Sequence, residues 1–349
     1  MSQGPLQLPE VLNAVQAALA AGRVDHASEM AEAGLADGLE HPLLLNLGAF
    51  RLELQGKYAA AIEMLHRALD LAPDDPFILN SIGVSYSKSA LPMEALAAFD
   101  AAVAVRPAFA PGHYGRGLAL AALGDRQGAK AAYVRAAELA ADFPDPLSGL
   151  AALAVDERRY EDARAHAQQA LALDPRQAAA SLSLAAVEVR EGQAEAAAAR
   201  IEALLKGGGL TPLHIGAALR QRADALDALG RYDEAIAAYH ESAQGLRRFH
   251  WPAYEAAGTE FGVEYCRRLL SYFETADAKA WRGKPAASPA AQHVFLVGFA
   301  RSGTTLLEQV LASHPDVVAL EEKPTLDPDA QEFFGDNAGL DRLAAPDDA

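Results

Sequence analysis

The sequence is poor in the features that mark several protein classes. Its 349 residues include a single cysteine, Cys266, so no disulfide can form within the chain. The ten histidines show no metal-ligand spacing, and we predict no metal site. No run reaches the roughly eighteen apolar residues of a membrane span, and the N-terminus lacks a secretory signal pattern. We therefore expect a cytoplasmic protein that has no membrane partner.

Basic residues are also scarce. The chain has 30 Lys and Arg against 47 Asp and Glu, which gives a formal net charge of -17. Binding of nucleic acid depends on neutralising phosphates with basic side chains, so this balance argues against a nucleic-acid partner. A basic or neutral partner fits the charge better. With 51% hydrophobic and 22% charged residues, the chain is expected to be globular and is long enough for two domains.

What the sequence does contain is an internal repeat. Small residues recur every 34 positions at Ala27, Ala61, Ala95, Ala129, Ala163 and Ala197, and again at Ala235 after four extra residues. A 34-residue period is typical of tetratricopeptide repeats, each a helix–turn–helix unit. Glycines mark the expected turns within the units at Gly22, Gly56, Gly124, Gly192 and Gly230. We predict about seven such repeats over residues 8–249, stacked as an α-solenoid.

Close packing and a binding groove follow from this repeat. Small residues on the first helix of each unit should let the second helix approach, at Ala49, Gly83, Gly117, Ala151 and Ala185. The stacked units should form a groove that binds a peptide or protein partner. Asn46 and Asn80 occupy the same repeat position and are candidate partner-binding residues, because their amides could bond a peptide backbone. Solvated or cap-bonded asparagines are the alternative interpretation.

The C-terminal part of the chain has a different organisation. Aromatic and apolar residues between Trp251 and Trp281 keep a helical period, so we predict capping helices over residues 250–282. Residues 283–292 break the periodicity and read as a linker. A second domain is expected over residues 293–349, where Val294–Val297 form an apolar strand that leads through Gly298 and Gly303 into a helix. This is the local build of a phosphate cradle.

The loop in that domain departs from a nucleotide-binding P-loop. Its spacing is Gly298-x4-Gly303-Thr304-Thr305, but Thr304 stands where the phosphate-gripping lysine should be. NTP hydrolysis by a P-loop NTPase is therefore the third-ranked hypothesis. Arg301, just before the helix start, is disfavoured by the helix dipole unless an anion lies between them. The alternative, a plain strand-to-helix turn capped by a hydroxyl, leaves Arg301 unexplained.

The residues of this loop resemble those of a known enzyme family. The run Arg301-Ser302-Gly303-Thr304-Thr305-Leu306-Leu307-Glu308-Gln309, followed by Leu311–Val317, resembles the 5′-phosphosulfate loop of sulfotransferases. The likeness is closest to bacterial sulfotransferases that contain tetratricopeptide repeats, relatives of protein-tyrosine sulfotransferases. The resemblance implies that Arg301, Ser302, Gly303, Thr304 and Thr305 bind 3′-phosphoadenosine 5′-phosphosulfate (PAPS) as co-substrate. The family usually has a proline before the arginine, where this chain has Phe299-Ala300.

The resemblance also suggests the catalytic residues. Val317–Leu320 read as a second strand, and Glu321 and Glu322 follow it, where α/β sheets gather ligands. By resemblance Glu322 is the general base, and Arg301 stabilises charge on the departing phosphate. A solvated acidic turn is the alternative for the two glutamates, and His314 is an alternative base. The acceptor hydroxyl is not specified, and protein tyrosine is one candidate.

The fold class that we predict is mainly α: a tetratricopeptide solenoid followed by the N-terminal fragment of a P-loop-like α/β sulfotransferase domain. Only 57 residues run from His293 to Ala349, and such a domain normally needs well over a hundred. We therefore expect an incomplete enzyme that binds donor weakly or not at all. A non-enzymatic tetratricopeptide scaffold that mediates protein–protein interaction is the alternative function.

Overall fold

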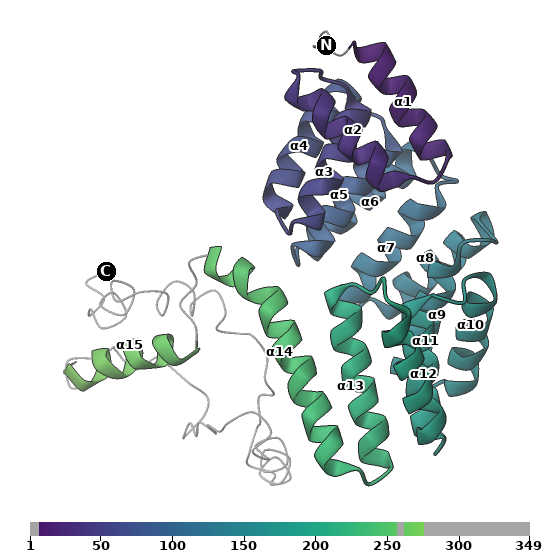
Figure 1. The fold of residues 1–349 in the computed structure, drawn as a ribbon, viewed down its shortest axis with the longest axis vertical. Coiled ribbons are helices and arrows are strands. Elements are labelled where there is room, and N and C mark those ends of the chain that lie inside the picture. The colour runs from purple at the N-terminus through teal and green to yellow at the C-terminus, as the bar shows by residue number, and fades with distance from the viewer. Residues whose placement is uncertain (1–6, 257–261, 276–349) are drawn as a thin grey trace, which may run out of the picture. The chain divides into compact units, whose positions relative to one another are not determined.

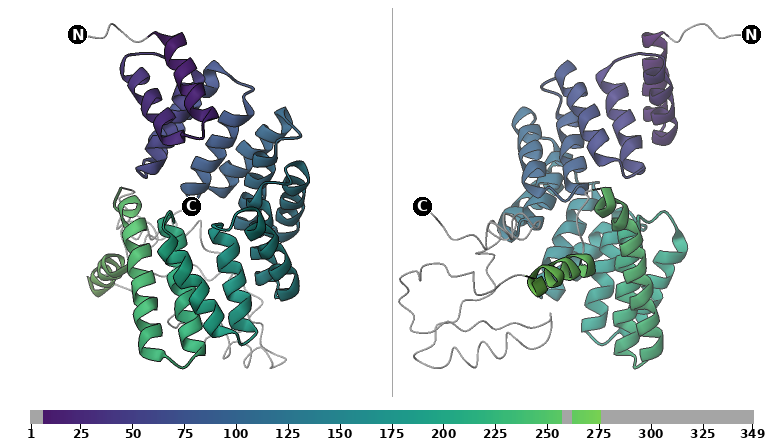
Figure 2. Two further views of the ribbon diagram at one scale, coloured as in Figure 1. Left: turned by 45° about the vertical axis from the view of Figure 1, so that its right-hand side comes forward. Right: turned by 90° about the vertical axis from the view of Figure 1, so that its left-hand side faces the viewer.

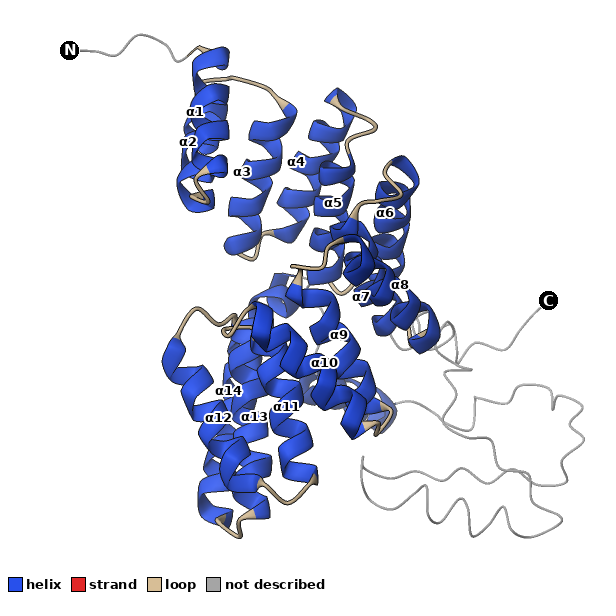
Figure 3. Ribbon diagram, turned by 90° about the vertical axis from the view of Figure 1, so that its right-hand side faces the viewer, coloured by secondary structure: helices blue, strands red, loops and turns tan. Residues whose placement is uncertain are grey.

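The computed structural model describes residues 7–256 and 262–275, and every described element is a helix (Figure 3). The chain divides into two compact units, Met1–Ala253 and Tyr254–Ala349. In the second unit the structure describes the end of α14 and helix α15 (Gly262–Thr275). The expected linker, both strands, the phosphosulfate loop and its helix lie outside the described residues.

The first unit is built from helical pairs (Figure 1). The first helices of the pairs are α1 (Leu8–Ala20), α3 (Pro42–Leu54), α5 (Pro76–Lys88), α7 (Ala110–Ala122), α9 (Pro144–Asp156), α11 (Ala178–Arg190) and α13 (Pro212–Ala228). The second helices are α2 (Val24–Ala36), α4 (Tyr58–Leu71), α6 (Pro92–Val105), α8 (Arg126–Leu139), α10 (Tyr160–Leu173), α12 (Ala194–Gly207) and α14 (Tyr232–Ala256). The seven predicted helix–turn–helix repeats are thus confirmed. The last helix continues beyond residue 249, where the sequence placed the end of the array.

The repeating alanines are the centre of each pair. All seven, from Ala27 to Ala235, lie on second helices and are at most 2% exposed. The first six sit where their own first helix and the next one converge, and Ala235 packs on α13 alone among the described residues, so a small side chain suits the close approach. The 34-residue period therefore reflects packing between helices.

The turns inside the pairs require a left-handed backbone. The predicted turn glycines have φ angles between 69 and 83°, a region that glycine enters without steric cost. The third and fifth pairs have no glycine at this position, yet Ala90 and Arg158 adopt the same conformation at φ 58° and 59°. The stacking of the pairs therefore imposes the turn geometry even where the local residue disfavours it.

Two aromatic rings lock neighbouring repeats together. Phe99 of α6 is 1% exposed, and it lies against Gly83 on α5 and Gly115 on α7. A Cβ atom added to Gly83 would lie 2.6 Å from Phe99 Cε1, far inside ordinary contact distance. Tyr133, one repeat later, meets Gly117 and Gly149 in the same way. The predicted role of small residues in close helix approach is confirmed at Gly83 and Gly117, and Gly115 and Gly149 share it without having been predicted.

Candidate functional site

The first helices form the inner layer of the array. Along the series α3, α5, α7, α9, α11 and α13, each helix contacts the next, and each also contacts its own second helix or that of the neighbouring pair. Within the described part of the chain, the second helices from α2 to α12 make no comparable contacts with one another. In a stacked array the layer whose helices meet directly is the inner, more tightly curved one. Figure 2 shows the helices at the C-terminal end of the array side by side.

Side chains that are not fully buried run along one side of each first helix. On α5 they are Phe77, Asn80, Val84 and Ser87, which are spaced by three or four residues and so share a face. Phe77 is 54% exposed. The same spacing recurs 34 residues later, because the repeat preserves the register. This stripe on the inner layer is the surface that a bound peptide would meet, and we call it the inner face.

The predicted partner-binding asparagines lie on the inner face. Asn46 on α3 and Asn80 on α5 are half-buried and occupy equivalent positions. The Oδ1 atom of Asn80 is buried and has no hydrogen-bond partner among the described residues. An unpaired acceptor of this kind costs free energy that a donor from a ligand could recover. The structure brings the two residues to one surface, and their binding role stays a prediction.

A buried carboxylate ties α3 to α5 beside these asparagines. Glu53 accepts a hydrogen bond from the Ser85 hydroxyl, and Lys88 Nζ lies 2.6 Å from its other carboxylate oxygen. The pair therefore leaves no uncompensated charge at this end of the inner face. This pair is not apparent from the sequence, because Glu53 and Lys88 are 35 positions apart and neither belongs to the alanine or glycine pattern.

A second polar cluster lies further along the inner face. Asp145 in the first turn of α9 accepts a hydrogen bond of 3.1 Å from the Gln177 amide at the start of α11. Burial raises the pKa of the Asp145 carboxyl, and the neighbouring Asp174 raises it further, while Gln177 and His214 act in the opposite direction. His214 on α13 is itself half-buried, and burial lowers its pKa. Three repeats thus contribute to one cluster.

Aromatic rings flank the cluster on its α7 side. Tyr114 has its ring centroid 5.8 Å from that of Tyr133 and 5.5 Å from that of Phe143, the latter edge to face. Burial raises the pKa of the Tyr114 hydroxyl, and the negative charge of Asp145 adds to the effect. Tyr114 stands 34 residues after Asn80, so extending the asparagine position by one repeat is the sequence pattern that could have found it.

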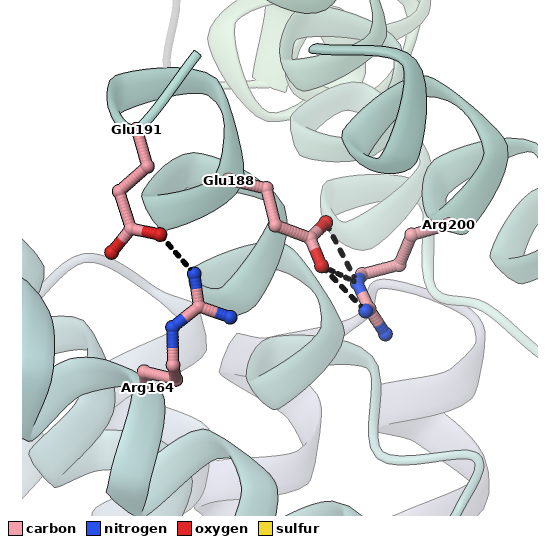
Figure 4. Close-up of polar contacts among 4 residues, drawn as sticks. All are labelled: Arg164, Glu188, Glu191 and Arg200. Atoms are coloured by element: carbon pink, nitrogen blue, oxygen red, sulfur yellow. Dashed lines mark hydrogen bonds and ion pairs between the residues drawn. The ribbon is translucent and has the colours of Figure 1, made fainter. Parts of the chain in front are cut away.

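Ion pairs join first and second helices near the C-terminal end of the array. Glu188 on α11 has a side chain that is 5% exposed. It accepts hydrogen bonds of 2.6 to 3.2 Å from two nitrogens of Arg200 on α12. Figure 4 shows this pair next to Arg164 of α10, which bonds Glu191 at the end of α11. Such pairs fix neighbouring helices and leave their charges compensated.

An outer cavity of about 540 Å³ lies between α2, α3 and α4. Its floor is apolar and includes Leu45, Leu52 and Met64. Arginines at its edge are already paired, since Arg51 Nε lies 2.8 Å from Glu32 and Arg67 bonds Glu40. The lining therefore offers no uncompensated charge that would select a ligand.

The predicted donor-binding and catalytic residues all lie outside the described residues. They are Arg301, Ser302, Gly303, Thr304, Thr305 and Glu322. Their roles therefore stay predictions from sequence.

Comparison with known proteins supports both halves of the architecture. Residues 293–347 match the family model described as the sulfotransferase family. Residues 81–145, 149–209 and 187–248 match the tetratricopeptide repeat model. The first match contains the whole loop from Gly298 to Thr305. A search of curated proteins found no match.

Solved structures agree with the fold of the array. The chain is similar to a structure described as the APC/C hetero-tetramer Cut9-Hcn1, with a TM-score of 0.56 and 19% identity over 67% of this chain. The match covers only 46% of that other chain, less than half its length. A tetratricopeptide repeat protein from Parabacteroides merdae gives a TM-score of 0.50 and 18% identity, covering 68% of this chain and 92% of that one. At these identities the likeness concerns the fold alone.

No helix within residues 7–256 or 262–275 combines the length and the apolar character that a bilayer span requires.

Proposed function

We propose that the chain is a PAPS-dependent sulfotransferase in which the helical array binds a peptide partner. The observation that carries this proposal is the sulfotransferase-family match over residues 293–347, because it covers both the phosphate-cradle loop and the acidic pair after it. Thr304 stands where a P-loop has its lysine, which fits a donor other than an NTP.

The chemistry assigned to these residues is in-line transfer of a sulfuryl group. The carboxylate of Glu322 takes the proton from the acceptor hydroxyl as the oxygen attacks sulfur, and the bond from sulfur to the phosphate oxygen breaks. Arg301 and the Ser302 hydroxyl stabilise the negative charge that develops on the departing phosphate. Backbone N–H groups of Gly303, Thr304 and Thr305 hold the same anion at the helix start. The reaction needs no metal, and a protein tyrosine is the acceptor that we propose.

A transfer assay tests this proposal. The full chain is incubated with donor that carries radioactive sulfur and with tyrosine-containing peptides, and label on the peptide is measured. We expect weak transfer by the wild type that Glu322→Gln abolishes, while Glu332→Gln, a carboxylate outside the motif, leaves it unchanged. Equal transfer by wild type and Glu322→Gln would remove the general base from the account.

A scaffold without enzymatic activity is the second candidate. It is favoured by the described structure, in which the helical pairs form an inner face that carries an unpaired buried oxygen at Asn80. Binding of a specific peptide by the chain, without label transfer in either variant, would favour this function. The two candidates therefore differ in one measurable property, the transfer of sulfur.

A further inference from the structure

One carboxylate on the inner face, Asp145, has no lysine or arginine partner among the described residues. Asp145 accepts its side-chain hydrogen bond from the neutral Gln177 amide, and no lysine or arginine of the described residues lies within ion-pair distance of it. The two buried glutamates of the described array are paired with basic residues, Glu53 with Lys88 and Glu188 with Arg200. Asp145 is instead a half-buried carboxylate whose charge is stabilised by its own backbone N–H, the Gln177 amide and His214, without a lysine or arginine.

The surroundings of Asp145 suit a cation better than any other group. Asp174 adds a second negative charge from the end of α10, and its field acts on the Asp145 carboxyl. Tyr114 lies close enough for the negative charge of Asp145 to raise the pKa of its hydroxyl. A half-buried carboxylate with a second negative charge nearby is a favourable environment for an ammonium or guanidinium group, which gains a charge-assisted hydrogen bond.

The same stretch of the inner face carries apolar surface. Leu118 follows Tyr114 by four residues on α7, so the two share a side of the helix, and Leu118 is 41% exposed. On α9 the exposed Ala152 follows Asp145 by seven residues on the same stripe. Small and apolar side chains here leave room for a peptide to lie close to the helices.

We propose that the inner face of α7, α9 and α11 binds a peptide through a lysine or arginine side chain that pairs with Asp145, with an apolar neighbour on Leu118. This inference rests on the proposed peptide-binding role of the array and names the chemistry of its partner. The net charge of -17 favours the encounter with a cationic segment, because long-range attraction raises the association rate.

Selection from a random peptide library tests the partner's chemistry. A phage-displayed library of dodecapeptides is selected on the full chain, and in parallel on Asp145→Asn, which keeps the shape of the side chain and removes its charge. We expect the wild-type pool to be enriched in lysine and arginine next to apolar residues, and the variant pool to lose that enrichment. A wild-type pool without basic residues, or a selection that yields no binder, overturns the proposal.

Affinities of one selected peptide then test the position of the contact. Asp156→Asn is the matched control, because Asp156 is an exposed carboxylate at the other end of α9. By fluorescence anisotropy, we expect Asp145→Asn to weaken binding about tenfold and Asp156→Asn less than twofold. Replacing the peptide's basic residue by glutamine should weaken binding to the wild type and have little further effect on Asp145→Asn.

Two outcomes contradict the assignment. Equal affinity of wild type and Asp145→Asn would remove Asp145 from the contact. If circular dichroism shows that Asp145→Asn does not fold, the peptide whose basic residue is replaced by glutamine still gives a test. Undiminished binding of that peptide to the wild type would refute a cationic anchor. Sulfuryl transfer is assigned to Arg301 and Glu322, which the peptide-binding experiments do not change. A negative result for Asp145 therefore does not count against the proposed transfer.

Discussion

The substitution Gly115→Ala tests how the repeats interlock. A Cβ atom at position 115 would lie 2.2 Å from Phe99 Cε1 and 2.5 Å from two further ring atoms. The ring cannot withdraw, because it is 1% exposed and Gly83 meets its other side, where an added Cβ would be 2.6 Å away. The new methyl group can be accommodated only if α5 and α7 move apart.

The magnitude follows from two opposing effects. Overpacking a filled core costs about 1–3 kcal/mol, and a contact more than 1 Å too short belongs at the upper end of that range. Alanine in a helix is favoured over glycine by about 1 kcal/mol, which offsets part of the loss. We therefore expect Gly115→Ala to lower the free energy of unfolding by about 2 kcal/mol. Urea denaturation followed by circular dichroism measures it.

A compensating variant makes the test specific. In the preceding repeat the positions equivalent to Gly83, Gly115 and Phe99 hold Ala49, Ser81 and Leu65. Smaller Leu at position 99 should therefore relieve the clash, so that Phe99→Leu costs stability in the wild type and restores part of it in Gly115→Ala. We expect a favourable coupling of about 1 kcal/mol between the two changes. Additive losses, or full stability of Gly115→Ala alone, would refute the interlocking of ring and glycine.

Three further predictions concern single residues of the array. Ala90→Gly should raise the thermal midpoint and stabilise the fold by about 0.5–1 kcal/mol, because a left-handed φ strains alanine; an unchanged midpoint would contradict this. Arg200→Ala should cost about 1–2 kcal/mol in urea denaturation, because it leaves the nearly buried Glu188 carboxylate unpaired, and Glu188→Gln should reduce that cost. Burial lowers the pKa of the His166 imidazole below its ordinary value of 6.5. The unfolded chain therefore binds a proton more readily than the folded chain, and the free energy of unfolding falls as the pH drops below 6.5. His166→Met, the residue that the second repeat has at this position, should show a smaller loss of stability between pH 7 and pH 5 than the wild type, and identical pH profiles would argue against a buried neutral imidazole.

Periodicity explains why so much of the array could be predicted from sequence. The alanine at each helix crossing and the glycine in most turns are local requirements of a repeated unit, so they appear at a fixed interval. Ala90 and Arg158 show the limit, since the packing of neighbouring pairs holds these turns without the residue that favours them. A period also gives the count of repeats, and seven pairs are found.

The polar cluster on the inner face could not be predicted in the same way. Gln177 bonds Asp145 and His214 acts on its charge from the starts of two later helices, and four extra residues before α13 shift its register relative to the repeat. Contacts between unlike positions of successive repeats depend on how the pairs stack, which the period does not encode. Asn46 and Asn80 were found because they share one position, whereas Asp145 belongs to no such series.

The proposed sulfuryl transfer depends most directly on binding of the donor's anionic end by the loop before Leu306. Isothermal titration of the chain with adenosine 3′,5′-bisphosphate, the spent donor, measures that binding. We predict a weak binding heat that Arg301→Ala abolishes and that Arg342→Ala, a control in the same segment, preserves. Titrations that do not differ between wild type and Arg301→Ala would contradict the central claim.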